Sequence, residues 1–407
     1  MLNLLYRHRN KILIFLFILY TTHFFNYSGW NPTLAGWCSY FIYSYILIMV
    51  LKHKSRINKI NSPFKYWPVY YMVLIAISVI SGFVLHGTSV FSERGTLTVS
   101  FVFLIYYYLY IKKISEKDII ILFTLAGLCI FLIQIFQIAF PNNAAFGTFD
   151  PDESRSDVAS MRNGIYRFMI DGVFFTLFCL YYYWSKLCEG FKITRLLMCA
   201  VFLTSMYLFL TRQIMFATII TLVLSSFFVR NKKIRQYVML SSILLCIILV
   251  LYSETLFGNL LRQTSEEASE DNIRLLSFSF YWNKIISNPV SFLFGNGHPS
   301  ALMHWQYDLR LFLSDIGLIG EMYYYGIFWI MMYFLTIYMI MVKYRKSIPL
   351  YLKLFIFGTF INSILVFPYR SAYEYFIWIS IIYICSLHIS FKYKISRTIG
   401  ATDRNAK

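Results

Sequence analysis

Charged residues are scarce in this chain. They occupy only 14% of the 407 positions, whereas hydrophobic residues occupy 58% and aromatic residues 20%. Soluble domains carry about 25% charged residues. The uncharged residues are gathered in runs of about 20, the length that a helix needs to cross a hydrocarbon core of about 30 Å. This pattern excludes an ordinary soluble domain. It predicts an all-α polytopic membrane protein, because lipid cannot satisfy the open backbone groups of other structures.

The interiors of the apolar runs lack ionisable side chains almost completely. Asp171, Glu321 and Glu374 fall near the ends of runs, and only His23 and His388 lie deeper, where we expect structural roles. Ion-coupled transporters normally carry charged residues near the middle of the membrane. Their absence argues against a coupled permease.

Paired cysteines are also absent. The seven cysteines include no CxxC pair; six lie in apolar runs and Cys188 lies in a short basic loop. A disulfide framework or a thiolate metal site is therefore not predicted. The basic residues Arg7, Arg9 and Lys11 precede an apolar run with no small-residue cleavage pattern after it, which predicts a retained first helix.

The apolar runs predict about twelve membrane spans in a single membrane domain over residues 1–407. They lie near 12–26, 33–51, 66–85, 96–111, 119–140, 168–185, 195–211, 213–229, 236–252, 317–342, 350–367 and 374–391.

Lysine and arginine residues predict the orientation of these spans. If both termini are cytoplasmic, 27 of the 37 basic residues but only 4 of the 19 acidic residues lie inside. This is a strong positive-inside bias, so the net charge reflects topology and implies no nucleic-acid partner. Two long outer segments follow, 141–167 and 253–316, together with a cytoplasmic tail at 392–407.

The basic residues assigned to the outside are nearly all arginine. Nine of the ten are Arg, whereas inside Lys outnumbers Arg by 18 to 9. The planar guanidinium is preferred where a phosphate must be held. Arg212 and Arg370 stand alone in tight turns, which favours phosphate binding; the alternative is that such arginines pair with acidic residues or reach lipid headgroups.

The outer segment carries a series of short motifs. Leu210-Thr211-Arg212-Gln213 is followed by Asn272-Ile273-Arg274, Tyr281-Trp282, Asn288-Pro289, Phe294-Gly295-Asn296-Gly297, a His, and Ser314-Asp315-Ile316-Gly317 at the entry to the next apolar run. In this order, over about Met198 to Tyr344, the chain resembles the O-antigen polymerase and ligase superfamily of bacterial inner-membrane proteins.

The resemblance implies a metal-independent GT-C glycosyltransferase without a cofactor, which uses undecaprenyl-pyrophosphate-linked oligosaccharides on the periplasmic side. It implies that Arg212 and Arg274 hold the pyrophosphate and that a loop His activates the acceptor hydroxyl. Arg310 and Arg370 are further candidates for pyrophosphate binding. The candidates for the general base are, in order, His304, His298 and Asp308.

Other outer residues are candidates for binding sugar or a second substrate. Trp282, Trp305 and Tyr307 could stack on sugar faces, and Asp315 or Glu321 could orient an arginine or a sugar hydroxyl. Arg162 and Arg167 could contact a second lipid-linked sugar, since a polymerase must hold donor and acceptor together.

The sequence predicts a polymerase of O-antigen, capsular polysaccharide or exopolysaccharide. One alternative is the ligase that moves the finished chain onto lipid A-core. The ligases usually carry a His followed by Asn where this chain has Gln306-Tyr307-Asp308, which weakens that alternative. The other alternative, from a different class, is a flippase or transporter of polysaccharide or lipid-linked sugars. The expected partners are the lipid-linked oligosaccharides and the bilayer. A chain-length regulator protein is a further candidate partner.

Overall fold

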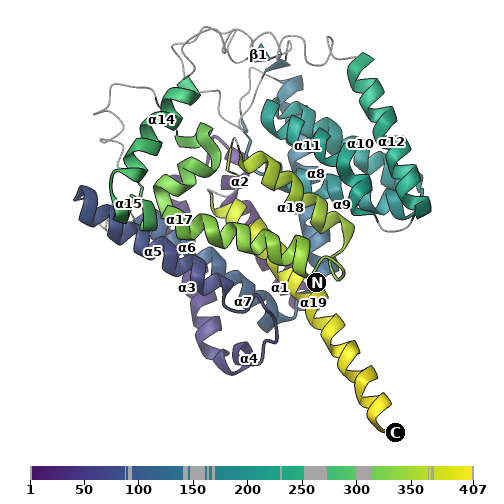
Figure 1. Cartoon of the computed structure of the whole chain (residues 1–407), viewed down its shortest axis with the longest axis horizontal. Helices are drawn as coiled ribbons and strands as arrows, with labels where there is room; N and C mark the ends of the chain where they lie inside the picture. Colours follow the sequence, from purple (N-terminus) through teal and green to yellow (C-terminus); the bar gives the residue numbers. More distant parts are fainter. Residues whose placement is uncertain are drawn as a thin grey trace.

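The computed structural model of the protein describes residues 2–87, 89, 94–140, 145–146, 161–162, 165–166, 170–229, 232–251, 273–298, 311, 313–364, 366–367 and 371–405. Helices make up most of this part of the chain and pack against one another (Figure 1).

The elements follow one another along the chain with few strands among them. The first half forms α1 (Leu2–Thr21), α2 (His23–Asn26), α3 (Pro32–Lys52), α4 (Lys54–Asn58), α5 (Trp67–His86), α6 (Arg94–Ser100), the 3₁₀ turn η1 (Phe101–Leu104), α7 (Ile105–Lys112), α8 (Glu116–Ala139) and the antiparallel pair β1 (Met161–Arg162) and β2 (Ile165–Tyr166). The second half forms α9 (Val173–Glu189), α10 (Ile193–Leu208), α11 (Arg212–Leu224), the 3₁₀ turn η2 (Ser225–Phe228), α12 (Lys232–Leu251), α14 (Ile273–Ile286), α15 (Pro289–Phe294), the 3₁₀ turn η3 (Leu313–Ile316), α17 (Gly317–Tyr338), the π-turn η4 (Met339–Lys343), α18 (Leu350–Ser363) and α19 (Ala372–Asn405).

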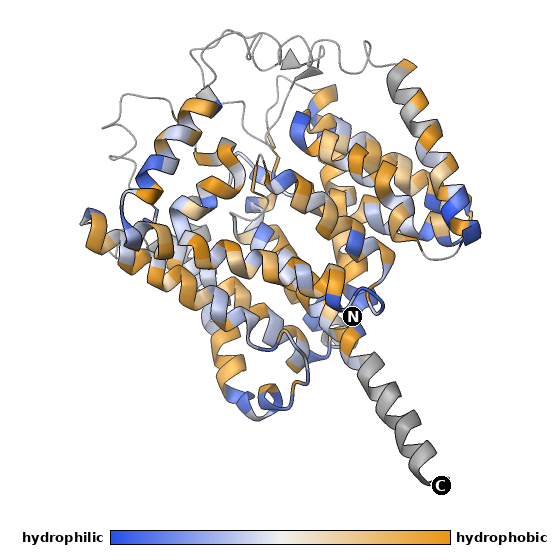
Figure 2. Ribbon diagram, in the orientation of Figure 1, coloured by the Kyte–Doolittle hydropathy of each residue, from blue (hydrophilic) through white to orange (hydrophobic). Residues whose placement is uncertain are grey.

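Every apolar run predicted from the sequence overlaps a helix of the structure. In the described part of the chain, five helical segments are long and apolar enough to cross a membrane: Trp67–His86, Gly95–Lys112, Glu116–Ala139, Gly317–Lys343 and Ala372–Ser390. Figure 2 shows the apolar residues along the helices and hydrophilic residues gathered at α4 and at the start of α12. The prediction of a helical protein with membrane-spanning segments is confirmed at this level.

Polar residues mark where several helices begin. Ser115 precedes α8, and its hydroxyl oxygen accepts a hydrogen bond from the backbone N–H of Asp118 at 3.2 Å. Asn288 caps α15 in the same way, accepting from the N–H of Val290 at 2.9 Å, and Pro289 is suited to the first helical position. The Asn-Pro pair seen in the sequence is thus a helix start within the segment 253–316.

Aromatic residues join the central helices. The ring of Trp329 in α17 lies 5.0 Å from that of Tyr71 in α5 and 6.2 Å from that of Tyr375 in α19. The indole N–H of Trp67 donates to the Thr336 hydroxyl at 2.8 Å, and the Tyr71 hydroxyl lies 3.0 Å from the same atom. The indole N–H and the tyrosine hydroxyl thus have hydrogen-bond partners, as buried polar groups generally do. The same contacts hold α5 against α17.

The start of α8 is tied to three other helices through two carboxylates. Asp118 Oδ1 lies 2.6 Å from Nζ of Lys11 in α1. Glu116 Oε1 accepts a hydrogen bond from the hydroxyl of Tyr351 in α18 at 2.5 Å, and its Oε2 lies 3.0 Å from Nε2 of His388 in α19. His388, deep in the last apolar run, therefore reaches the start of α8.

Candidate functional site

Two segments that are far apart in the chain meet at the first turns of α11 and α14. Arg212 is the first residue of α11, and Arg274 follows Ile273 at the start of α14. The side-chain amide of Gln213, with its oxygen turned toward Arg274, accepts hydrogen bonds from Nη2 at 2.9 Å and from Nη1 at 3.2 Å. The guanidinium of Arg274 is therefore held beside the residue that follows Arg212.

This arrangement suits an anion for three physical reasons. The first backbone N–H groups of a helix lack partners within the helix, and the aligned peptide dipoles place a partial positive charge there. Arg212 and Arg274 add full positive charges to these helix starts. An amide side chain is uncharged, so Gln213 orients the Arg274 guanidinium without itself neutralising it.

One face of α14 anchors the helix to α17. Ser277, Tyr281 and Ile285 recur at every fourth position and are all buried, with 1%, 6% and 0% of their surface exposed. The Tyr281 ring lies 5.0 Å from that of Tyr323 in α17, and its hydroxyl donates to the carbonyl of Leu311 at 3.3 Å. This anchoring fixes the direction in which the remaining face of α14 points.

A second face of α14 carries Arg274 together with two aromatic rings. Phe278 and Trp282 follow Arg274 at successive steps of four residues, so the three side chains share one side of the helix. The rings of Phe278 and Trp282 are stacked, with centroids 6.2 Å apart and planes 10° from parallel. The structure therefore places Trp282, a candidate for sugar binding, on the same face as Arg274.

The turn Gly295–Gly297 is bonded directly to the backbone of α17. The N–H groups of Asn296 and Gly297 donate to the carbonyls of Tyr323 at 2.8 Å and of Tyr324 at 3.1 Å. The Asn296 side-chain amide also donates to the Tyr323 carbonyl, at 3.1 Å. These carbonyls are available because α17 is kinked at Gly326, where φ is 76° and ψ is 179°.

Glycine is required on both sides of this contact. A Cβ at Gly295 would lie 2.2 Å from the carbonyl oxygen of Tyr324, and a Cβ at Gly326 would lie 2.3 Å from that of Leu293. Both glycines also have positive φ, at 82° and 76°, which side chains disfavour. The two backbones therefore touch with no space for a side chain.

Asn296 also connects this turn to α5. Its side chain is buried, with the residue 3% exposed, and its amide nitrogen donates to the Ser291 hydroxyl at 2.7 Å. Its amide oxygen lies 3.0 Å from Nε2 of His86 at the end of α5. The Ser81 hydroxyl of α5 donates to the Gly295 carbonyl at 2.5 Å. The turn is thus held from α5, α15 and α17 at once.

His298 follows this turn and packs on the tyrosines of α17. Its ring is stacked on Tyr324, with centroids 4.3 Å apart and planes 13° from parallel, and lies 5.6 Å from Tyr325. The Tyr325 hydroxyl lies 3.3 Å from that of Tyr375 in α19. The structure therefore gives His298 a defined orientation beside α17.

Two acidic residues lie beside these tyrosines. Glu321, in the first turns of α17, is only 1% exposed and acts electrostatically on Tyr375 together with Glu374. Glu374 accepts a hydrogen bond from the backbone N–H of Ser371 at 2.7 Å. The carboxylates and tyrosine hydroxyls near the starts of α17 and α19 offer polar groups of the kind that bind sugar hydroxyls.

The structure describes five of the predicted site residues with their side chains: Arg212, Arg274, Trp282, His298 and Glu321. It brings Arg274 into contact with Gln213, the residue that follows Arg212, and it places Trp282 on the Arg274 face of α14. It places His298 against Tyr324 of α17.

The remaining predicted residues are described in part or not at all. Arg162 lies in β1 and Asp315 in η3, where only their backbones are described. Outside the described residues lie His304, Asp308, Arg310, Arg370 and Arg167, as well as Trp305 and Tyr307. Within the described residues, no group of three or more His, Cys, Asp or Glu side chains is arranged to hold a metal ion.

The sequence analysis assigned no role to three residues that organise the site. Gln213 and Asn296 stand inside recognised motifs, and an amide next to an arginine or between two glycines is the signal that could have identified them. His86 has no such local signal, because its contact with Asn296 depends on how α5 packs.

The comparisons with known proteins identify no relative of this chain. No family model matches it, and neither does a curated protein or a solved structure. Its function is therefore inferred from the site described above.

Proposed function

We propose that this chain is a polysaccharide polymerase of the bacterial inner membrane. It would join oligosaccharide repeat units carried on undecaprenyl pyrophosphate into O-antigen, capsular polysaccharide or exopolysaccharide. About twelve helices would span the membrane, with both termini in the cytoplasm and the starts of α11 and α14 facing the periplasm.

One observation carries this proposal: the contact of Arg274 with Gln213, next to Arg212. The two arginines belong to segments that are far apart in the chain, and they stand at neighbouring helix starts. Such a pair is suited to a diphosphate, since a guanidinium fork matches phosphate oxygens and a helix start favours negative charge. The sequence resemblance assigns the same two arginines to the lipid pyrophosphate.

The reaction needs few protein groups. A hydroxyl oxygen of the acceptor sugar forms a bond to C1 of the donor sugar, while the bond from C1 to the pyrophosphate oxygen breaks. The hydroxyl proton passes to a base, and the lipid pyrophosphate leaves with its electron pair. Arg212 and Arg274 would stabilise the negative charge that grows on the leaving group, and a donor of this kind is worth about 10²–10³ in rate.

The base and the sugar-binding residues follow the predictions from the sequence. The loop residues His304, His298 and Asp308 remain the candidates for the base, in that order, and a base adds about 10²–10⁴ in rate. Trp282 would stack on a sugar ring beside Arg274. Arg162 and Arg167 would hold the second lipid-linked substrate.

The position of the buried charges favours an enzyme over a flippase. Glu321 and Lys353, both buried, lie in the first turns of α17 and α18, and Glu116 lies at the start of α8. A flippase for lipid-linked sugars would need a cationic cavity among the helices. Within the described helices, the buried charges are instead at helix ends.

Deletion of the gene separates the candidate functions. Loss of a polymerase leaves a single repeat unit attached to the lipid A-core, which a gel of the lipopolysaccharide resolves. Loss of a ligase leaves no repeat unit on the core, and loss of a flippase leaves lipid-linked repeat units on the cytoplasmic side. A core without any repeat unit would overturn the polymerase proposal.

The purified protein provides a direct test. The full chain in lipid nanodiscs, supplied only with lipid-linked repeat units, should form longer lipid-linked chains and release one lipid pyrophosphate for each bond made. Chain growth without that release would exclude the proposed leaving group.

A further inference from the structure

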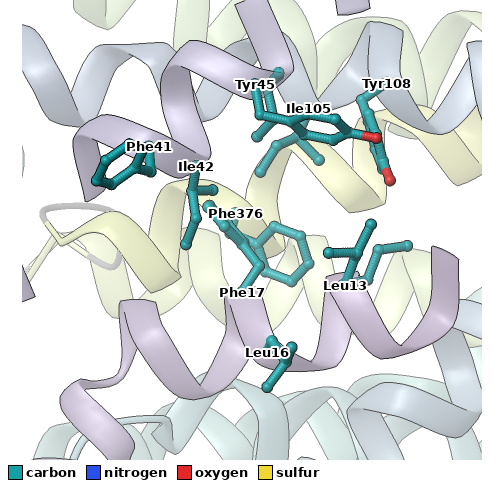
Figure 3. Close-up of a pocket in the computed structure, with 11 residues that line it drawn as sticks. Leu13, Leu16, Phe17, Phe41, Ile42, Tyr45, Ile105, Tyr108 and Phe376 are labelled. Carbon is teal, nitrogen blue, oxygen red and sulfur yellow. The ribbon is translucent and has the colours of Figure 1, made fainter. Parts of the chain in front are cut away.

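A cavity of about 270 Å³ opens among α1, α3, α7 and α19, and none of the residues that line it belongs to the candidate site. Figure 3 shows apolar side chains from these helices around it. Its deepest residues are buried, with Phe17 5%, Ile105 3% and Phe376 1% exposed. This volume holds part of one hydrocarbon chain, since pockets for whole drug-sized ligands measure about 300–1,000 Å³.

The rim of the cavity lies on an exposed apolar surface. Leu16 of α1 is 52% exposed and Phe41 of α3 is 75% exposed, and both line the cavity. Ile105 belongs to the helical segment Gly95–Lys112, which is long and apolar enough to cross a membrane. A surface of this kind in a membrane-spanning helix bundle meets lipid hydrocarbon, so the cavity opens toward the acyl chains.

One end of the cavity carries two hydroxyl groups and lies near positive charge. The hydroxyl groups of Tyr45 and Tyr108 lie together at the end next to Leu13 (Figure 3). Lys112 follows Tyr108 by one helical turn, and its Nζ lies 5.9 Å from the centre of the Tyr108 ring. Arg9, one turn before Leu13 in α1, acts electrostatically on both Tyr108 and Lys112.

A third cation adds to this group. Arg56 of α4 also acts electrostatically on Lys112. Arg9, Arg56 and Lys112 come from three different helices, and their like charges repel one another. An anion between them would relieve this repulsion, and anionic lipid headgroups attract basic residues at the ends of membrane helices.

We propose that this cavity binds one anionic phospholipid, a ligand and site separate from the lipid-linked sugars of the proposed function. One acyl chain lies on Phe17, Ile105 and Phe376, and the phosphate lies among Arg9, Arg56 and Lys112. The apolar cavity and the cationic end together match the two parts of such a lipid. A zwitterionic lipid would fill the cavity but would bring no net negative charge to the end near Arg9, Arg56 and Lys112.

The test uses the full chain in nanodiscs that contain phosphatidylglycerol and phosphatidylcholine in equal amounts. Native mass spectrometry after release from the disc counts the lipids that stay bound. The wild-type protein should retain one phosphatidylglycerol in preference to phosphatidylcholine. Arg9→Gln and Lys112→Gln should each weaken this preference about fivefold, the factor that corresponds to one basic residue near a membrane surface.

Two further variants complete the test. Lys117→Gln removes the same charge from an exposed position at the start of α8 and should leave the preference unchanged. Leu16→Trp fills the cavity from its exposed rim without touching the buried residues and should reduce the retention of both lipids. The proposal would be overturned if the wild type retained the two lipids equally, or if Arg9→Gln and Lys112→Gln bound them as the wild type does. It would also be overturned if the cavity were covered by a second copy of the chain and no lipid stayed bound.

Discussion

The first turns of α8 and the first turns of α11 and α14 use their charged side chains in different ways. At α8, carboxylates contact side chains of other helices: Asp118 lies 2.6 Å from Lys11, and Glu116 lies 3.0 Å from His388. At α11 and α14, a neutral amide, that of Gln213, orients the arginine. A carboxylate that contacts a basic side chain fixes one helix against another, whereas the amide of Gln213 orients the Arg274 guanidinium and carries no charge of its own.

We infer that the residues at α8 stabilise the bundle and that those at α11 and α14 act on a substrate. Substitutions at α11 and α14 should then affect chain elongation more than stability, and substitutions at α8 should affect stability alone.

Removal of either arginine should abolish long polysaccharide. Arg212→Ala and Arg274→Ala each remove one donor to the leaving pyrophosphate, so each should reduce the rate of elongation about 10²–10³-fold. The measurement is the chain-length distribution on a gel, together with the amount of protein inserted in the membrane. Normal chain length in both variants would contradict the proposal that these two arginines bind the pyrophosphate.

A conservative variant sharpens this test. Arg274→Lys keeps the positive charge but loses the planar fork that Gln213 holds, so it should restore only a small part of the activity. The matched control is Lys284→Ala, which removes a positive charge from the last turn of the same helix and should leave chain length normal. Equal losses in Lys284→Ala and Arg274→Ala would indicate that charge alone matters.

Loss of the general base should have the next largest effect on the rate of elongation. His304→Ala should slow elongation about a hundredfold, which lies within the range for a general base. His298→Ala should slow it about tenfold, because this ring is stacked on Tyr324 and its loss would disturb the site indirectly. Rates from purified variants with lipid-linked repeat units decide the order, and the opposite order would reassign the base to His298.

The turn that contacts α17 should be sensitive to a single methyl group. Gly295→Ala places a Cβ 2.2 Å from the Tyr324 carbonyl oxygen, at a φ of 82°. The variant should lose about 3 kcal/mol of stability, in the range of strained backbone positions. Thermal unfolding of the detergent-solubilised protein measures this loss.

A second glycine provides the control for this variant. Nothing lies within 4 Å of a Cβ built on Gly95, so Gly95→Ala should leave the unfolding temperature unchanged or slightly raised. A Gly295→Ala protein as stable as Gly95→Ala would show that the turn is not pressed against α17.

The start of α8 should show the smallest effect and only on stability. Glu116→Gln removes the charge that faces Tyr351 and His388, so it should lower stability by about 1 kcal/mol with chain length unchanged. Lys117→Gln, at the neighbouring exposed position, should change stability by less than about 0.5 kcal/mol. Shortened polysaccharide in a stable Glu116→Gln protein would break the distinction between the two regions.

The helical class of the protein could be predicted because it depends on local composition. Each apolar run from 12–26 to 374–391 overlaps a helix, since a run without charges satisfies its backbone groups by forming one. The segment 253–316, taken as a long outer loop, contains α14 and α15 in its described part. Its helices were missed because they are short and carry charged and polar residues among the apolar ones.

The candidate site could be predicted only as a set of residue types. Arg212 and Arg274 stood out because arginine is favoured over lysine in the outer segments. Their partner Gln213 and the link between Asn296 and His86 could not be predicted, because those contacts join helices that are distant along the chain.

Composition alone was enough to predict that the chain forms apolar helices suited to a membrane and to show that Arg exceeds Lys in the segments assigned to the outside. Both properties follow from which residues stand in each run, and no contact between runs is needed to establish them. The packing of the helices was needed to show that Arg274 contacts Gln213 and that the Gly295 turn fits into the kink of α17. These contacts depend on how whole helices pack, since each helix presents one face to its neighbours and the angles between helices set which residues meet.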